Sequence, residues 1–169
     1  GGQRDLFIKL TENDNKIINN LQIDEFITIN NGDFRGRGNK CWPTVRWKEL
    51  VKKLKKIGLS TVQLGVECDE FIEGSYDLRG KTTIYEAAAI IKQSLNHIDT
   101  EGGLVYLSKA VGQKSIVLFG PNYPGFFGLK GNINYRGGDD ICEPCCYKDG
   151  WWWKCHLGYD SCKAMEDIA

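Results

Sequence analysis

Short apolar runs alternate with helix-length segments along most of this 169-residue chain, and the alternation restricts the folds it can adopt. The runs are rich in β-branched residues, which favours buried strands, whereas the segments between them space apolar residues as an amphipathic helix does. We expect strands at residues 26–30, 61–65, 96–99, 115–119 and 132–135. Helices are expected at residues 43–57, 85–95 and 102–111. Such alternation is typical of a parallel sheet flanked by helices, so the predicted fold class is α/β and Rossmann-like.

One predicted helix has a clear start signal. Thr83 is followed three residues later by Glu86, the spacing at which each side chain can bond the other residue's backbone N–H group. This pair predicts a capping box at the start of the helix expected at residues 85–95.

The chain divides into three predicted segments. Residues 1–24 carry weak helical signals and several Asn and Asp residues, and we interpret them as a lead-in outside the sheet. Residues 25–136 carry the alternation and are predicted to form the Rossmann-like domain. The periodicity stops near Gly137 and Gly138, so residues 137–169 are interpreted as a Cys-rich segment with the start of a C-terminal helix.

Charge and hydropathy exclude some classes of partner. Lys plus Arg number 22 and Asp plus Glu number 22, so the formal net charge is zero. A generic nucleic-acid binder gains its affinity from an excess of cations, and we expect no nucleic-acid partner. No apolar run is long enough to span a bilayer, and residues 1–24 lack the apolar core of a signal peptide. The sequence therefore predicts a soluble, cytoplasmic protein.

Four cysteines near the C-terminus stand at C-x2-C-x9-C-x6-C spacing: Cys142, Cys145, Cys155 and Cys162. Four thiolates can close a tetrahedral site for zinc or iron, and a closed site is structural rather than catalytic. Cys146 competes with Cys145 as a ligand, and His156 competes with Cys155. The alternative is that the cysteines are unligated or form disulfides, which a cytoplasmic location disfavours.

The predicted strand ends carry residues suited to binding an anion. Gly102 and Gly103 open a predicted helix, where exposed backbone N–H groups and the helix dipole favour phosphate. A cation from a neighbouring loop, such as Arg37 or Lys40, would complete a diphosphate site. The alternative interpretation is an ordinary capped turn. The chain has neither the glycine fingerprint of hydride-transfer Rossmann enzymes nor a P-loop.

Several motifs in order resemble the C-terminal half of glycosyltransferase family 9, the bacterial heptosyltransferases, over roughly residues 25–169. They are Lys40-Cys-Trp-Pro43, the glutamates Glu67 and Glu70, Asp77-Leu-Arg-Gly-Lys-Thr-Thr83, Asp99-Thr-Glu-Gly-Gly-Leu104 and Leu118-Phe-Gly-Pro121. These enzymes have two Rossmann-like domains in the GT-B arrangement. The Cys-rich segment is similar to the iron-binding cysteine finger of autotransporter heptosyltransferases, which glycosylate protein.

The resemblance implies a nucleotide-sugar-binding domain that takes an ADP-heptose-type donor. The transfer would be inverting, to a hydroxyl of lipopolysaccharide, another glycan or a protein. Lys40 would contact the donor diphosphate, and Glu70 (or Glu67, because the register is open) would bind the ribose. The other implied donor-site residues line the cleft or hold the diphosphate and sugar: Thr82, Thr83, Asp99, Thr100, Gly102 and Gly103.

The chain departs from the family pattern in two places and covers only part of it. Tyr106 stands where the family usually has His, and Asn122 follows Phe-Gly-Pro where the family usually has Thr. The acceptor site and the proposed general base belong to the family's N-terminal domain, so no catalytic residue is predicted here. We expect weak nucleotide binding without catalysis, in the cytoplasm or at the inner membrane. The alternative is a non-catalytic interaction module that forms homo-oligomers through its metal finger.

Overall fold

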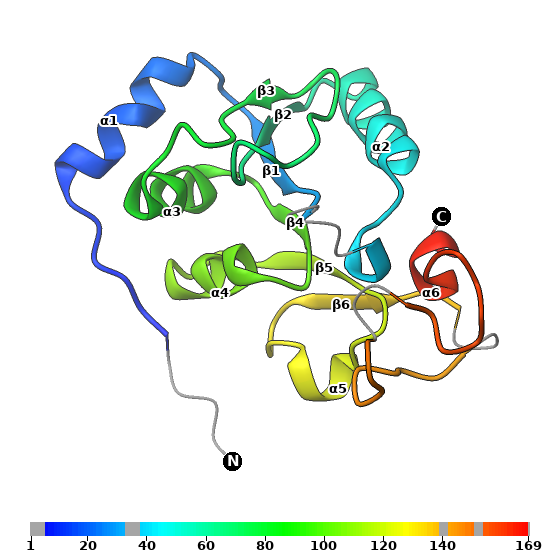
Figure 1. Cartoon of the computed structure of the whole chain (residues 1–169). Coiled ribbons are helices and arrows are strands. Elements are labelled where there is room, and N and C mark those ends of the chain that lie inside the picture. The colour runs from blue at the N-terminus through cyan, green and yellow to red at the C-terminus, as the bar shows by residue number, and fades with distance from the viewer. Residues whose placement is uncertain (1–5, 33–37, 139–141, 151–153, 169) are drawn as a thin grey trace.

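The computed structural model describes residues 6–32, 38–138, 142–150 and 154–168, and within them six parallel strands form one sheet (Figure 1). The strands are β1 Phe26–Asn30, β2 Ser60–Gln63, β3 Tyr76–Asp77, β4 His97–Thr100, β5 Ser115–Phe119 and β6 Ile133–Arg136. Their order across the sheet is β3-β2-β1-β4-β5-β6. All neighbouring strands run parallel. This is the strand order of the doubly wound Rossmann fold, so the predicted fold class is confirmed.

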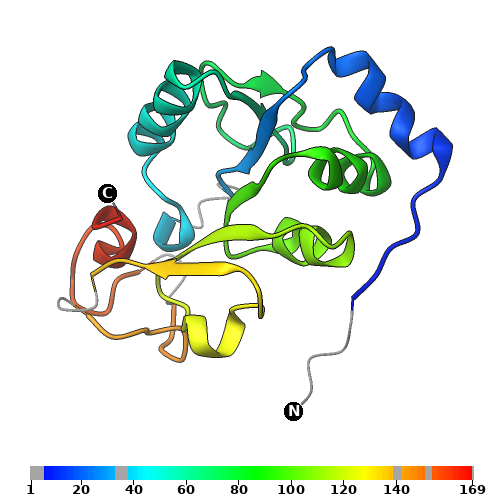
Figure 2. The ribbon, with the colours of Figure 1, turned by 180° about the vertical axis from the view of Figure 1, so that it is seen from behind.

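Helices cover both faces of the sheet (Figures 1 and 2). The helices are α1 Glu12–Leu21, η1 Gly38–Lys40, α2 Thr44–Lys56, α3 Ile84–Gln93, α4 Gly103–Ala110, α5 Pro124–Phe127 and α6 Lys163–Glu166. Successive side chains of β1 point to opposite faces. Ile27 and Ile29 therefore join a core with Trp47 of α2, while Phe26 joins another with Ile90 of α3. No described helix is long and apolar enough to cross a membrane.

The lead-in segment forms a regular helix on the outside of the sheet. Thr11 and Asp14 make a capping box at the start of α1, and Leu21 at its end is buried in the same cluster as Phe26 and Ile90. Figure 1 shows α1 lying beside α3. The predicted capping box at Thr83 is also present, and α3 begins directly after it.

Three short elements, η1, β3 and α5, were not expected from the sequence. β3 has only two residues, too few for a period-two pattern to register, and it extends the sheet beyond β2. α5 lies in the glycine- and proline-rich segment 120–131, where no element was expected, and Pro124 at its first helical position favours this short helix. The other predicted boundaries agree within two residues. β2 ends at Gln63 rather than at Gly65, whose φ of 136° leaves the extended region.

The C-terminal residues pack into the core of the main domain. Met165 and Ile168 are buried with Trp42 and Trp47, on the face of the sheet that α2 also covers. The indole Nε1 of Trp42 donates a hydrogen bond of 3.0 Å to the carbonyl of Ile168. The end of the Cys-rich segment thus shares its core with residues more than a hundred positions earlier, which fixes α6 beside β5.

Candidate functional site

A cavity of about 630 Å³ opens at the carboxyl ends of β1, β2 and β4. We call it the switch-point cavity, because the chain order of the strands reverses between β1 and β4 and ligands of such sheets bind there. Its walls come from the residues that follow these strands, from the starts of α3 and α4, and from residues 6–8 of the lead-in. The lead-in is held there by a hydrogen bond of 3.1 Å from the Ile8 N–H to the Ala110 carbonyl.

The fold brings most of the sequence-predicted donor-site residues together at this cavity. The predicted residues that line the cavity are Lys40, Thr82, Thr83, Asp99, Thr100, Gly102 and Gly103. Glu70 does not line it, because its carboxylate accepts a hydrogen bond of 2.6 Å from the Thr44 hydroxyl at the start of α2. Glu67 lies outside the lining as well.

Asp69 is the acidic side chain of the β2–β3 loop that lines the cavity, and the sequence analysis missed it. The side chain is buried, and its Oδ2 accepts a hydrogen bond of 2.8 Å from the Val66 N–H. Gly65 permits this turn, because its φ is 136° and a Cβ there would lie 2.2 Å from Asp69 Oδ2. A glycine after a strand with an aspartate four residues later was the available signal.

A second missed residue, Glu101, pairs with Lys40 inside the cavity wall. The Lys40 ammonium contacts the Glu101 carboxylate, and the two side chains are only 15% and 14% exposed. Asn122 donates a second bond to the same carboxylate through its Nδ2. Glu101 lies between Thr100 and Gly102, so a carboxylate inside a predicted anion-binding motif was the sequence signal for it.

The start of α4 forms another part of the wall. Gly102 is its N-cap residue and offers no side chain to the first-turn N–H groups. A Cβ at Gly103 would meet nothing within 4 Å, so the space in front of this helix end is open. First-turn N–H groups lack partners within their own helix and attract anions. Tyr106, on the second turn, also lines the cavity.

Asp99 is almost fully buried and is linked to a polar chain that runs into the sheet. Its Oδ2 lies 3.3 Å from His97 Nε2, and the other ring nitrogen of His97 lies 3.0 Å from the Thr28 hydroxyl. Burial raises the pKa of Asp99, and the hydrogen bond from His97 offsets part of this effect. The Asp99 carboxyl therefore ionises less readily than an exposed one, which reduces its repulsion of an anion.

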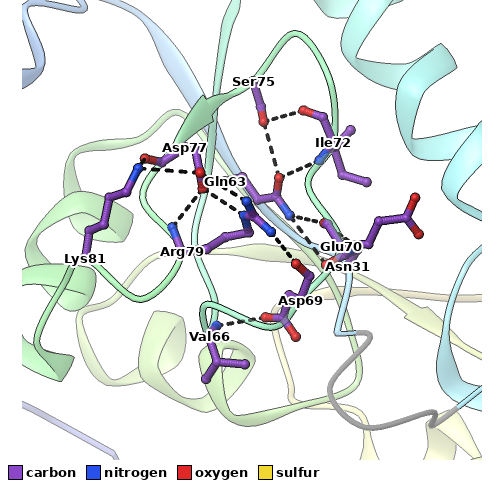
Figure 3. Close-up of polar contacts among 10 residues, drawn as sticks. All are labelled: Asn31, Gln63, Val66, Asp69, Glu70, Ile72, Ser75, Asp77, Arg79 and Lys81. Carbon is purple, nitrogen blue, oxygen red and sulfur yellow. Dashed lines mark hydrogen bonds and ion pairs between the residues drawn. The ribbon is translucent and has the colours of Figure 1, made fainter.

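The loop that follows β2 is braced by buried polar contacts (Figure 3). Gln63 is fully buried, and its amide donates to the Glu70 carbonyl and accepts from the Ile72 N–H, each at 2.8 Å. Arg79 donates to Asp77 at 2.8 Å and to the carbonyl of Asp69. These hydrogen bonds fix the position of the cavity-lining part of the loop. The side chains that make them, Gln63, Asp77 and Arg79, lie outside the cavity lining.

Replacing Arg79 by methionine should lower stability in a pH-dependent way. Arg79 lowers the pKa of Asp77 to about 2, below its unfolded value, so this stabilisation is complete above about pH 4 and disappears as the pH falls to about 2. Because Asp77 is 28% exposed, we expect a loss of only about 1 kcal/mol at pH 7 in urea unfolding. Lys81→Met is the control, since Lys81 is 59% exposed. An equal loss for Arg79→Met at pH 2 and pH 7 would contradict this assignment.

The Cys-rich segment surrounds a second, much smaller cavity, which we call the cysteine cavity. The four predicted ligands, Cys142, Cys145, Cys155 and Cys162, all line it, as does His156. Cys146 does not line it. Arg136 reaches this cluster from the end of β6 and donates to the Cys142 Sγ at 3.4 Å. The fold thus brings together thiols that are up to twenty residues apart.

The thiol chemistry at the cysteine cavity suits a cation. The seven cysteines all lie in the described ranges and none forms a disulfide, and within these ranges no group of three His, Cys, Asp or Glu side chains has metal-holding geometry. Burial, together with the neighbouring thiols, raises the pKa of Cys145 to about 11, and burial raises the pKa of Cys162. A coordinated cation would reverse this effect. Four thiols are nonetheless the kind of donor set that zinc and iron take. Trp151, Trp152 and Trp153, expected to pack over this site, lie outside the described residues.

Strand order and cavity position define the class of this protein as a Rossmann-like α/β domain with a cavity at the switch point. The profile of glycosyltransferase family 9 (heptosyltransferase) matches residues 8–148, and the chain belongs to this family. The match ends before Cys155 and Cys162. A comparison with curated proteins finds no match.

Solved structures of this family share the fold. The family 9 glycosyl transferase of Veillonella parvula DSM 2008 has 21% identity and a TM-score of 0.67 over 78% of this chain and 42% of that protein. The E. coli ADP-heptose lipopolysaccharide heptosyltransferase II has 17% identity and a TM-score of 0.68 over 96% of this chain and 49% of that one. The chain thus spans less than half the length of these proteins.

A third solved structure is similar over a smaller part of the chain. TibC of enterotoxigenic E. coli, a dodecameric iron-containing heptosyltransferase solved with ADP-D-β-D-heptose, has 16% identity and a TM-score of 0.61. The alignment covers 69% of this chain and 32% of TibC. The similarity concerns the fold.

Proposed function

We propose that this chain is the donor-binding half of an inverting glycosyltransferase that uses an ADP-heptose-type donor. One observation carries the proposal: the switch-point cavity collects the family motif residues from three separate parts of the chain, at Lys40, at Thr82 and Thr83, and from Asp99 to Gly103. The family membership and the ADP-heptose donors named for heptosyltransferase II and TibC support the choice of donor.

The cavity residues suit the successive parts of such a donor. The diphosphate would lie against the start of α4, with Lys40 as its cationic contact. The Thr83 hydroxyl accepts the Glu86 N–H at 3.2 Å and keeps its own proton for a phosphate oxygen. Apolar side chains from α3 and α4, among them Ile84 and Leu107, offer a surface for the nucleobase.

The ribose would lie against the loop that follows β2. Of the acidic side chains of this loop, Asp69 already lines the cavity, whereas Glu70 would have to leave the Thr44 hydroxyl to reach it. Tyr106 can donate a hydrogen bond to the donor but cannot act as a near-neutral acid, as the histidine usual at this position can.

The proposal assigns acceptor recognition and the catalytic base to a separate N-terminal domain. The acceptor would be a hydroxyl of lipopolysaccharide, another glycan or a protein, and the whole enzyme would work in the cytoplasm or at the inner membrane. The chain on its own should bind nucleotide and not turn it over. Joining it to an N-terminal Rossmann-like half and assaying heptose transfer would test this division of labour.

Calorimetric titration of ADP, ADP-heptose, GDP and UDP into the chain tests the proposal. We expect saturable binding of ADP and ADP-heptose, and weaker binding of GDP and UDP. Absence of saturable heat with any of the four at millimolar concentration would overturn it. Thermal melting with and without ADP gives a second measurement, because a ligand that binds only the folded state raises the melting temperature.

We also propose that the cysteine cavity holds one structural zinc or iron ion. Its ligands would be Cys142, Cys145, Cys155 and Cys162, with His156 as the alternative to Cys155. The convergence of four thiols on one cavity supports this proposal, and the iron named for TibC favours iron among the candidates. The ion would hold the segment between β6 and α6 and supply no step of the transfer.

Replacing Cys142 by serine is expected to remove the metal ion. We expect about one ion per wild-type chain by elemental analysis, and almost none in Cys142→Ser, because a closed site needs all four ligands. Cys146→Ser is a matched control, since Cys146 lies next to the ligand Cys145 but does not line the cavity. Loss of metal from Cys146→Ser with full retention in Cys142→Ser would show that the ligand set is wrong.

The dodecameric state named for TibC supports a second candidate function, as an interaction module. In this case the metal segment would hold copies of the chain together. Sedimentation analysis of wild type and Cys142→Ser distinguishes the two functions: a metal-dependent oligomer supports the module, and a monomer in both forms excludes it.

A further inference from the structure

The cavity position assigned to the donor diphosphate already holds a carboxylate. The Lys40 ammonium pairs with Glu101, and both side chains are largely shielded from water. Carboxylate and phosphate oxygens compete for the same lysine N–H groups. A diphosphate that reaches Lys40 must therefore displace Glu101, or share the ammonium with it.

Two hydrogen bonds with groups outside the cavity lining hold Glu101 in this position. Asn122 donates its amide to the Glu101 carboxylate, and the Glu101 backbone N–H donates to the Leu118 carbonyl at 3.3 Å. Asn122 is buried and does not line the cavity. Residue 122 is one of the two departures from the family pattern, and its contact with Glu101 gives that departure a local role.

The charges around the cavity make this pairing important for an anionic ligand. Among the described residues that line the cavity, the acidic side chains are Asp69, Asp99 and Glu101, and Lys40 is the only cation. Burial disfavours the charged form of Asp99, but Glu101 directly faces the lysine that a diphosphate needs. Of the three acids, Glu101 therefore opposes diphosphate binding most directly.

We propose that Glu101 is a resident anion that occupies Lys40 until the donor diphosphate displaces it, and that the freed carboxylate then accepts hydrogen bonds from the donor's sugar hydroxyls. Glu101 would thus determine specificity for the whole donor over the free nucleotide. The inference rests on the proposed donor site. It follows from the position of Glu101, which directly precedes the Gly102 and Gly103 start of α4.

Such a carboxylate affects ADP and ADP-heptose differently. ADP would displace Glu101 from Lys40 and offer the carboxylate no new hydrogen-bond donor. The whole free-energy cost of breaking the Lys40–Glu101 pair therefore lowers the affinity for ADP. ADP-heptose brings hydroxyl donors that Glu101 can accept, and this offsets the cost. The difference favours exchange of the product ADP for a fresh donor.

Glu101→Gln tests the proposal because glutamine keeps the shape of the side chain and removes its charge. We expect ADP affinity to rise by roughly 5- to 10-fold in calorimetric titration, the size of an effect of one partly buried charge pair. ADP-heptose affinity should stay equal or fall, so that the preference for ADP-heptose over ADP falls by at least roughly 5- to 10-fold. Asn122→Ala loosens Glu101 from outside the cavity and should change ADP affinity in the same direction, by less.

Glu73→Gln is the matched control, because Glu73 is exposed and lies outside the cavity lining. It should leave both affinities unchanged, and thermal melting checks that every variant is folded. Unchanged ADP affinity in Glu101→Gln, or equal gains for ADP and ADP-heptose, would overturn this inference while leaving the donor site intact. Failure of the wild-type chain to bind either ligand would instead overturn the proposed function, and the inference with it.

Discussion

Lys40→Met is expected to weaken ADP binding by about 30- to 150-fold, the largest loss we predict for a single change in the cavity. Truncating one member of a buried charge pair typically costs 2–5 kcal/mol, and for this partly exposed pair we take the lower part of that range, about 2–3 kcal/mol, where about 1.4 kcal/mol corresponds to a factor of ten. Two effects combine here. The diphosphate loses the only cation that the described cavity lining offers, and Glu101 remains as an uncompensated carboxylate facing it.

Lys40→Arg and a double variant separate these two effects. Arginine keeps the charge, so Lys40→Arg should retain most of the binding. Lys40→Met combined with Glu101→Gln removes the uncompensated carboxylate and should recover part of the loss, which calorimetry measures directly. Contacting residues are expected to be non-additive in this way. Lys40→Met with wild-type ADP affinity would show that the diphosphate binds elsewhere.

Gly137→Val is expected to cause the largest loss of stability, by detaching α6 from the sheet. A Cβ at residue 137 would lie 2.8 Å from the Ala164 carbonyl oxygen, 2.9 Å from the Asp167 carbonyl carbon and 3.0 Å from the Ile168 nitrogen. All three are backbone atoms, which a side-chain rotation cannot move away. Overpacking of this kind costs about 3 kcal/mol, which lowers the melting temperature of a domain of this size by roughly 6–12 °C.

The expected unfolding begins at the C-terminus. Limited proteolysis of Gly137→Val should cut near α6 before it cuts the rest of the chain, because Met165 and Ile168 would leave the shared core. Gly38→Ala is the control, since a Cβ at Gly38 would meet nothing within 4 Å. Equal melting temperatures for wild type and Gly137→Val would show that the close approach of α6 is not needed for stability.

The strands and long helices were predictable because their signals are local. The β-branched run at 26–30, the capping box at Thr83 and the helix start at Gly102 depend on neighbours within a few residues, and the structure has an element at each. β3 and α5 were not predictable in this way, since elements of two and four residues are too short to show a period. β3 forms because β2 supplies its pairing partner, and α5 begins at Pro124 and packs beside β6.

The candidate site was predictable where a motif lies at the end of a strand. The carboxyl ends of parallel strands meet on one edge, so Lys40, Asp99 and Gly102 lie at one cavity as the order of motifs implied. The acidic residue after β2 was ambiguous, because loop geometry rather than spacing decides which side chain turns inward. Asp69 lies at the cavity, whereas the Glu70 carboxylate bonds the Thr44 hydroxyl.

The sequence by itself determined the fold class, the order of the elements and the family, because each depends on patterns that short stretches of chain carry. Only the tertiary structure decided which distant residues meet. It put Glu101 against Lys40 and Asn122, and the C-terminal helix beside two early tryptophans. Such contacts depend on the packing of whole elements, which no local spacing encodes. The contact between Glu101 and Lys40 is the one on which the proposed role of Glu101 rests.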